Sequence, residues 1–377
     1  LFQLSTDEIT SLFHKMRMDF NSSSQKVSFL VGMLARMVLS SVIEGDRRDT
    51  AEFMSGIKND QITPTKEMWD RQLEYLENKI KKFAADTPIN CSRAYISDKC
   101  KDFAMRGNGI YKITVPTGGG KTLSTLRYAL SHAKEHNKSR VIFIIPLLSV
   151  LEQNSKVINS YIKDKDLITE HHSNVVKTTE NAEQFDKYEL LSDTWDTPII
   201  ISTLVQLLNM LFSNKTTAIR RMCSLTNSVI VIDEIQSLPR NITDMFNMAI
   251  NFLAYYCNTT VVLSSATQPC FDKANSPLKL SESPEMVPYN KDVFTVFKRT
   301  KIVDKTTPYG ITIEQLTDFS VNIMKDHSSL LVICNTKSTA LNLYNSINNL
   351  NCCNKYKLFH LSTSMCMRHR IDTLEKV

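Results

Sequence analysis

A glycine-rich segment that ends in lysine and threonine is the part of the sequence whose chemistry can be named most directly. Residues 115–122 read VPTGGGKT and place three of the chain's nine glycines side by side. A β-prone run precedes the segment, and a helical pattern at 123–130 follows it. Glycines let backbone N–H groups approach an anion, and a helix N-terminus adds partial positive charge. The segment therefore predicts a phosphate-binding loop.

Each residue of this loop has an expected task. Lys121 would reach the β and γ phosphates, and Thr122 would ligate Mg²⁺. Val115 departs from the general pattern, which has glycine there. A glycine turn before an ordinary helix is the alternative, and the context on both sides argues against it. The expected ATP-binding residues are Thr117, Gly118, Gly119, Gly120, Lys121 and Thr122.

An acidic pair follows a second apolar run. Asp233 and Glu234 come directly after four apolar residues, so they would lie at the carboxyl end of a buried strand, where open α/β sheets bind ligands. Asp233 would hold the Mg²⁺ of the nucleotide, and Glu234 would orient the attacking water as a general base. The alternative is that Asp233 and Glu234 lie in a solvated loop without a function, and the phosphate loop upstream argues against it.

A third signal follows the run at 260–263. Ser265, Ala266 and Thr267 stand there, 32 residues after Asp233, and are expected to couple hydrolysis to movement. Gln236 would bridge the nucleotide site to this turn. The alternatives are that 265–267 form a turn without a function and that Gln236 is an ordinary surface residue.

The elements that must position these residues alternate along the chain. Short apolar runs separated by helical patterns predict a parallel sheet buried on both faces. The expected strands lie at 110–115, 141–145, 198–201, 228–232 and 260–263. A second set follows, with strands at 294–303, 330–334 and 357–361 and helices at 312–326 and 336–348. Helices are also expected at 27–43, ended by 44–50, and at 61–85.

Composition narrows the class of protein. A length of 377 residues suits two or three domains, and 42% apolar residues can build their cores. The net charge of +6 is compatible with a polyanionic partner without requiring one. Nine scattered cysteines without a C-x-x-C pair indicate a reduced, cytoplasmic protein. Neither a signal peptide nor a run of 18 apolar residues is evident, so no membrane partner is expected.

Taken together, the motifs resemble those of superfamily 2 helicases, and most closely the CRISPR-associated helicase–nucleases of type I systems. The loop, the Asp-Glu box and Ser-Ala-Thr carry the broader resemblance. The segments that carry the narrower one lie at 114–124, 144–146, 170–173, 233–236, 265–269, 334–336 and 361–370.

The resemblance implies an α/β fold of tandem RecA-like lobes with parallel sheets, the second lobe incomplete, behind a helical remnant of an HD nuclease domain. The implied domains are the HD remnant at 1–55, a helical linker at 56–88, the ATP-binding lobe at 89–270, a linker at 271–292 and the partial second lobe at 293–377.

The HD remnant is expected to lack nuclease activity. Residues 45–50 (GDRRDT) resemble the family's final metal-ligand segment, which makes Asp46 the candidate ligand. Residues 1–60 contain a single histidine, His14, whereas an HD site needs several. The transition metal is therefore expected only in a full-length protein. An acid near a helix C-terminus is the alternative for Asp46.

For the motor, the resemblance implies ATP-dependent unwinding of DNA, with an RNA-guided CRISPR surveillance complex as partner. Pro146, Ser149 and Thr203 would contact the phosphates of single-stranded DNA, or serve as helix caps in the case of Ser149 and Thr203. The family's catalytic arginines lie beyond Val377, so this chain is expected to bind ATP but turn it over poorly. Another nucleic-acid motor, such as an RNA helicase or restriction translocase, and a nucleotide-binding scaffold without motor activity are the alternatives.

Overall fold

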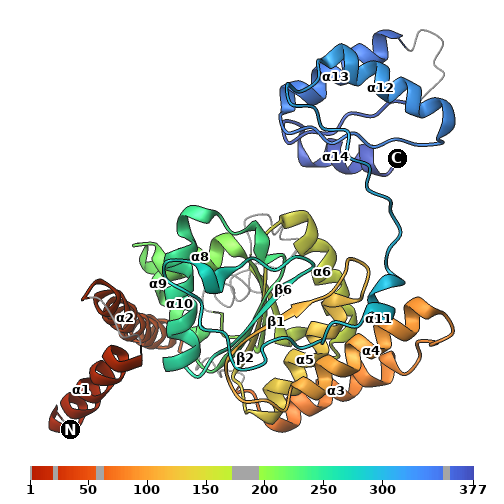
Figure 1. The fold of residues 1–377 in the computed structure, drawn as a ribbon. Coiled ribbons are helices and arrows are strands. Elements are labelled where there is room, and N and C mark those ends of the chain that lie inside the picture. The colour runs from red at the N-terminus through yellow and green to blue at the C-terminus, as the bar shows by residue number, and fades with distance from the viewer. Residues whose placement is uncertain (1, 20–23, 57–62, 172–194, 351–356) are drawn as a thin grey trace. The chain divides into compact units, whose positions relative to one another are not determined.

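The computed structural model describes residues 2–19, 24–56, 63–171, 195–350 and 357–377. The chain divides into two compact units, Leu1–Arg299 and Thr300–Val377, and each is described here by itself (Figure 1).

A six-stranded parallel sheet forms the centre of the first unit, with the strand order β1-β6-β5-β2-β4-β3. The five runs expected as strands form strands close to their expected bounds, and β3 is an additional edge strand. The strands are β1 (Ile110–Thr114), β2 (Arg140–Ile145), β3 (Ile168–His171), β4 (Ile199–Thr203), β5 (Ser228–Ile232) and β6 (Thr260–Ser265). Strand order places β6 between β1 and β5, so the ends of these three strands are neighbours.

Successive residues of each strand enter two different cores. In β2, Ile142 and Ile144 pack on one face, whereas Val141, Phe143 and Ile145 pack on the other. Because neighbouring side chains in a strand point to opposite faces, a sheet covered on both faces needs an unbroken apolar run. This explains why the strands could be predicted from such runs.

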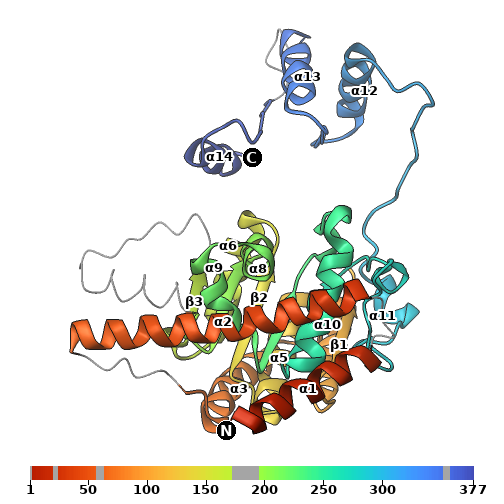
Figure 2. The same cartoon turned by 90° about the vertical axis from the view of Figure 1, so that its left-hand side faces the viewer.

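Helices cover both faces of the sheet (Figures 1 and 2). One face packs against α2 (Ser24–Ser55), α8 (Leu204–Phe212) and α10 (Thr243–Tyr256). The other packs against α3 (Lys66–Ile80), α4 (Pro88–Phe103), α5 (Lys121–Glu135) and α6 (Leu148–Tyr161). The shorter elements are α9 (Thr216–Arg220), α11 (Lys291–Thr295), η1 (Lys165–Leu167), η2 (Arg221–Leu225), η3 (Ile235–Ser237), η4 (Arg240–Ile242) and η5 (Phe271–Lys273).

The N-terminal region is helical, as expected, and consists of α1 (Phe2–Asp19) and α2. The expectation that α2 ends within 44–50 is wrong, because the helix continues to Ser55. Side chains within 44–50 hold α2 against the rest of the first unit. Glu44 pairs with both Arg48 and Arg220, and Arg48 reaches Asp196 at 3.0 Å. These contacts tie the second half of α2 to the sheet-bearing part of the unit.

Helix α2 is long and apolar enough over Gln25–Met54 to cross a membrane, by length and composition alone. Its packing offers a different reason for that composition. Leu30 and Met33 enter the core, and Ser40 donates a hydrogen bond to the carbonyl of Arg220 and accepts one from the amide of Cys223. The apolar residues of α2 are thus partly explained by its packing within the first unit.

Residues 271–299 form the last part of the first unit and pack beside β1. Phe271, Leu278, Met286 and Val287 are buried within this stretch, which the sequence suggested as a linker over 271–292. Backbone hydrogen bonds run along the outer edge of β1, including one from the amide of Met286 to the carbonyl of Lys112.

The second unit contains α12 (Ile313–Asp326), α13 (Lys337–Leu350) and α14 (Met367–Leu374). The first two confirm the helices expected at 312–326 and 336–348. The strands expected at 294–303, 330–334 and 357–361 are wrong for the described residues, and part of the first of these runs is the helix α11. In the second run, Leu331 is 81% exposed and Ile333 is 84% exposed. An apolar run becomes a strand only where a neighbour pairs with it, and no described segment pairs with this one.

Candidate nucleotide-binding site

The glycine-rich loop joins the end of β1 to the start of α5, at one end of the sheet. Gly118 (φ 87°) and Gly120 (φ 80°) adopt the left-handed conformation that favours glycine. Gly119 is close-packed instead, since a Cβ placed on it would collide with the side chain of Val115. The loop therefore turns tightly, with no side chain at three successive positions before the first turn of α5, which suits a phosphate-binding loop.

A glutamate that the sequence reasoning missed anchors the base of this loop. Glu285 accepts hydrogen bonds from the amide of Thr114 at 2.8 Å and from its hydroxyl at 2.7 Å. Burial raises the pKa of the Glu285 carboxyl, although the hydrogen bonds from Thr114 oppose that shift. No local motif marks Glu285, because it lies 171 residues from Thr114 in the chain.

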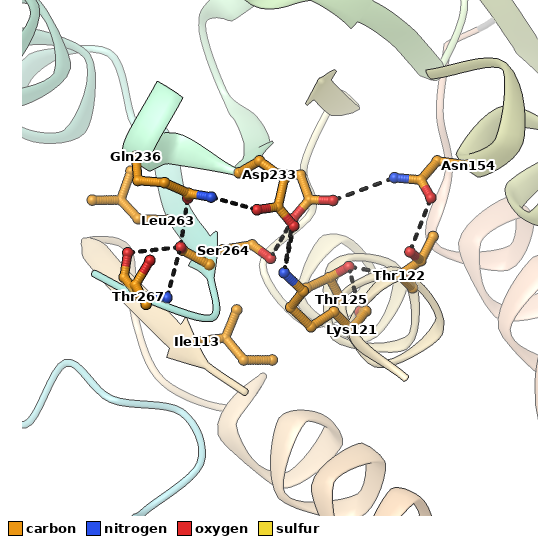
Figure 3. A network of polar contacts seen from close by, with 12 residues as sticks. Ile113, Lys121, Thr122, Thr125, Asn154, Asp233, Gln236, Leu263, Ser264 and Thr267 are labelled. Carbon is orange, nitrogen blue, oxygen red and sulfur yellow. Dashed lines mark hydrogen bonds and ion pairs between the residues drawn. The ribbon is translucent and has the colours of Figure 1, made fainter. Parts of the chain in front are cut away.

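The lysine of the loop faces the acidic pair. Nζ of Lys121 donates to Oε1 of Glu234 at 2.7 Å and lies 4.0 Å from Oδ1 of Asp233 (Figure 3). Burial favours a higher pKa for the Glu234 carboxyl, but hydrogen bonds from Lys121 and Gln236 prevail and lower it. Glu234 is thus held as a carboxylate next to the phosphate loop. Its backbone is left-handed, with φ 46°, which turns the chain sharply after β5.

The two residues expected to bind magnesium are joined by a third. Asn154, on α6, accepts a hydrogen bond from the Thr122 hydroxyl at 3.2 Å and donates one to Oδ2 of Asp233 at 3.3 Å (Figure 3). Ser264 donates to the other carboxylate oxygen at 2.8 Å. Hydroxyl and carboxylate oxygens suit Mg²⁺, and here they come from the first turn of α5 and from the end of β5. The donor set therefore fits a magnesium ion.

A chain of hydrogen bonds leads from the acidic pair to the Ser-Ala-Thr turn. Gln236 donates to Oε2 of Glu234 at 2.6 Å, and its own Oε1 lies 2.6 Å from the Ser265 hydroxyl (Figure 3). Ser265 also accepts a hydrogen bond from the amide of Thr267 at 3.0 Å, across Ala266. Lys121, Glu234, Gln236 and this turn thus form one connected network.

The residues expected to touch DNA lie at the ends of β2 and β4. Pro146 follows Ile145, which pairs with Thr203 in the sheet. The Thr203 side chain accepts from the amide of Gln206 at 3.3 Å and so caps α8, which is the alternative use considered for it. Ser149 lies in the first turn of α6, and its side chain is outside the described part of the structure.

Asp46 takes no part in the network around Lys121. It is an exposed residue within α2, and the Thr50 hydroxyl donates to its carbonyl. The described residues contain no group of three or more histidine, cysteine or acidic side chains that could hold a metal ion. In the segment at 170–173, which resembles the helicase–nuclease family, His172 and Ser173 lie outside the described residues.

The chain is similar in sequence to known helicases. The family model for DEAD/DEAH box helicases matches residues 96–274. The CRISPR-associated nuclease/helicase Cas3 of Haloferax volcanii is 25% identical over an alignment that covers 42% of this chain and 19% of that protein. The chain thus aligns with about a fifth of the length of this curated relative.

Solved structures show the same fold. The crystal structure of T. fusca Cas3 superimposes with a TM-score of 0.56 at 16% identity, covering 85% of this chain and 40% of that one. T. fusca Cas3-ATP gives a TM-score of 0.58 at 16% identity, covering 80% and 39%. The sheet, the phosphate loop and the acidic pair all fall within the matched family segment. Residues 96–274 are therefore similar in sequence to DEAD/DEAH box helicases, and the chain has the fold of the T. fusca Cas3 structures.

Proposed function

We propose that this chain binds ATP and magnesium at the phosphate loop and uses hydrolysis to move along single-stranded DNA, as a helicase or translocase. The observation that carries the proposal is the connected network from Lys121 through Glu234 and Gln236 to Ser265. A loop that binds phosphate would not need a link to a second turn, whereas a motor must pass the state of its nucleotide to other parts of the protein.

The chemistry follows from the groups in place. Backbone amides of the loop and Lys121 hold the phosphates, so Lys121 must exchange Glu234 for the β and γ phosphates. Glu234, freed from that pair, accepts a proton from the attacking water as a general base. When bound, Mg²⁺ neutralises charge on the phosphate oxygens, and Thr122 and Asp233 are the residues that would hold it. Gln236 then senses the change at Glu234 through their shared hydrogen bond.

DNA contact is assigned to the ends of β2 and β4. Pro146 and Thr203 lie at the carboxyl ends of neighbouring strands, and Ser149 lies in the first turn of α6, which follows β2. Backbone amides and hydroxyls there can contact phosphates without reading bases. Thr203 is buried and its hydroxyl caps α8, so its backbone rather than its hydroxyl would contact the DNA.

The biological setting is inferred from the relatives. Likeness to Cas3 supports a cytoplasmic role in type I CRISPR interference, with recruitment by an RNA-guided surveillance complex and cutting by an HD nuclease domain. Helices α1 and α2 would be the part of that domain contained in residues 1–55, with Asp46 as its remnant ligand. The lobe boundaries at 89–270 and 293–377 belong to the same proposal.

An ATPase assay with defined polynucleotides tests the function. Single-stranded DNA is expected to stimulate hydrolysis more than RNA of the same sequence, and Lys121→Ala is expected to abolish the stimulated rate. A slow stimulated rate alongside tight ATP binding would agree with the weak turnover expected from the sequence. Preferential stimulation by RNA would point to an RNA helicase, and tight ATP binding with no stimulated hydrolysis at all would point to a scaffold without motor activity.

A further inference from the structure

Asn154 occupies a place in the site that neither the motifs nor the proposed chemistry assigns. It projects from α6, 32 residues after Thr122 and 79 residues before Asp233, and its side chain contacts both (Figure 3). Leu151 and Ile158, one turn to either side on the same face of α6, are fully buried. The helix is therefore fixed against the sheet, and Asn154 is the polar residue that this packed face directs into the site.

The orientation of the Asn154 amide follows from its partners. The Asp233 carboxylate can only accept hydrogen bonds, so the NH₂ group of Asn154 must face it. The amide oxygen then faces Thr122, whose hydroxyl must donate its single proton. This leaves the lone pairs of the Thr122 oxygen available to a cation.

Thr125, also on α5, shows where a threonine hydroxyl in a helix usually donates its proton. The Thr125 hydroxyl bonds back to the carbonyl oxygen of Lys121 at 2.9 Å, within its own helix. The Thr122 hydroxyl is instead directed out of α5 towards Asn154. Asp233 is similarly oriented, because Ser264 and Asn154 each donate to a different carboxylate oxygen.

We infer that Asn154 is a positioning residue for the magnesium ion of the nucleotide: it turns the Thr122 proton away from the cation and fixes the Asp233 carboxylate. The inference rests on the proposed function. Residues that orient metal ligands through hydrogen bonds typically change metal affinity by about 10- to 100-fold when they are lost.

The test measures how binding of a fluorescent ATP analogue by the whole chain depends on Mg²⁺ concentration. In Asn154→Ala the half-saturating Mg²⁺ concentration is expected to rise about 10-fold or more, while affinity for the analogue in EDTA stays unchanged. Thr122→Ala serves as the benchmark for loss of a direct ligand. Asn154→Leu, which fills the space without polar atoms, is expected to behave like Asn154→Ala.

Asn159→Ala is the matched control. Asn159 lies on the same helix and donates to Ser155 and Glu170, outside the nucleotide site. Its removal is expected to leave the Mg²⁺ midpoint unchanged. If Asn154→Ala weakens binding equally with and without Mg²⁺, or leaves the midpoint unchanged, the inference is overturned. If the unmodified chain binds no analogue under any condition, the proposed function fails instead.

Discussion

Nζ of Lys121 lies 2.7 Å from Oε1 of Glu234, so the residue expected to hold phosphate is paired with the residue expected to activate water. Both side chains are partly buried, at 13% and 32% exposed. Under the proposed function, an entering triphosphate would break this pair and release the carboxylate. Nucleotide binding and activation of the general base would then be linked through one hydrogen bond.

Glu234→Gln is expected to separate binding from hydrolysis. The amide cannot accept a proton from water, so turnover should fall by about 10²- to 10⁴-fold. ATP affinity should stay equal or increase, because Lys121 no longer has to break an ion pair with Glu234 before it binds phosphate. Steady-state hydrolysis and equilibrium binding on the same preparation measure both. Exposed Glu282→Gln is the control, and a parallel loss of binding and turnover would contradict the assigned role.

Gln236→Ala is expected to uncouple hydrolysis from the DNA strand. The substitution removes the link between Glu234 and Ser265 but leaves the phosphate loop intact. ATP should still bind, while stimulation by single-stranded DNA should fall several-fold. Ser265→Ala should have the same effect, and the double variant should be no worse than either single one, since both break one chain. Additive losses would show that the two residues act separately.

Gly118→Ala is expected to impair nucleotide binding mainly through backbone strain. Its φ of 87° is unfavourable for alanine by about 1–2 kcal/mol, whereas the new methyl group would meet only the flexible end of the Arg299 side chain, which can move aside at little cost. Binding titrations of Gly118→Ala with and without Arg299→Ala distinguish these causes. Partial recovery in the double variant would identify the collision, and undiminished affinity in Gly118→Ala would contradict the cradle geometry.

His132 is expected to make stability depend on pH. Burial lowers its pKa from 6.5 to about 3, so the folded protein holds this imidazole neutral where the unfolded chain protonates it. The unfolded state then binds more protons, and the free energy of unfolding falls as pH drops from about 6.5 towards 3, by up to about 1.4 kcal/mol per pH unit. Urea unfolding at several pH values should give a shallower slope in His132→Gln. An unchanged slope would contradict the assignment.

Glu44→Ala is expected to loosen α2 from the sheet-bearing part of the first unit. Arg220 is only 7% exposed and loses its carboxylate partner in this variant, which typically costs about 3–5 kcal/mol. Thermal unfolding measures the effect. Asp46→Ala, two residues along the same helix and exposed, should change stability little. Equal melting temperatures for both variants would show that α2 is not held by this ion pair.

The sequence predicted the parts of the site that are local in the chain. The phosphate loop and the strand before Asp233 each carry their elements and their chemistry in fewer than 15 consecutive residues. Strand β3 was missed because only Thr169 of its four residues is fully buried, which leaves a weak pattern. The run at 330–334 was predicted as a strand and is not one, because an apolar run also needs a neighbouring strand to pair with.

Asn154 and Glu285 could not be predicted for a different reason. Each is an isolated polar residue whose partners lie far away in the chain, so no spacing marks it. Their roles depend on which helix or edge segment packs beside the loop. Such tertiary relationships became visible only after the sheet order placed β5 next to β2 and the 281–287 stretch beside β1.

The most direct measurement is calorimetric titration of the chain with a non-hydrolysable ATP analogue, with and without magnesium, alongside Lys121→Ala and Asp233→Asn. A single site is expected, with affinity that increases on adding magnesium, falls at least 10-fold in Lys121→Ala and loses its magnesium dependence in Asp233→Asn. Equal affinity in all three proteins would mean that the loop and the acidic pair do not form a common nucleotide site.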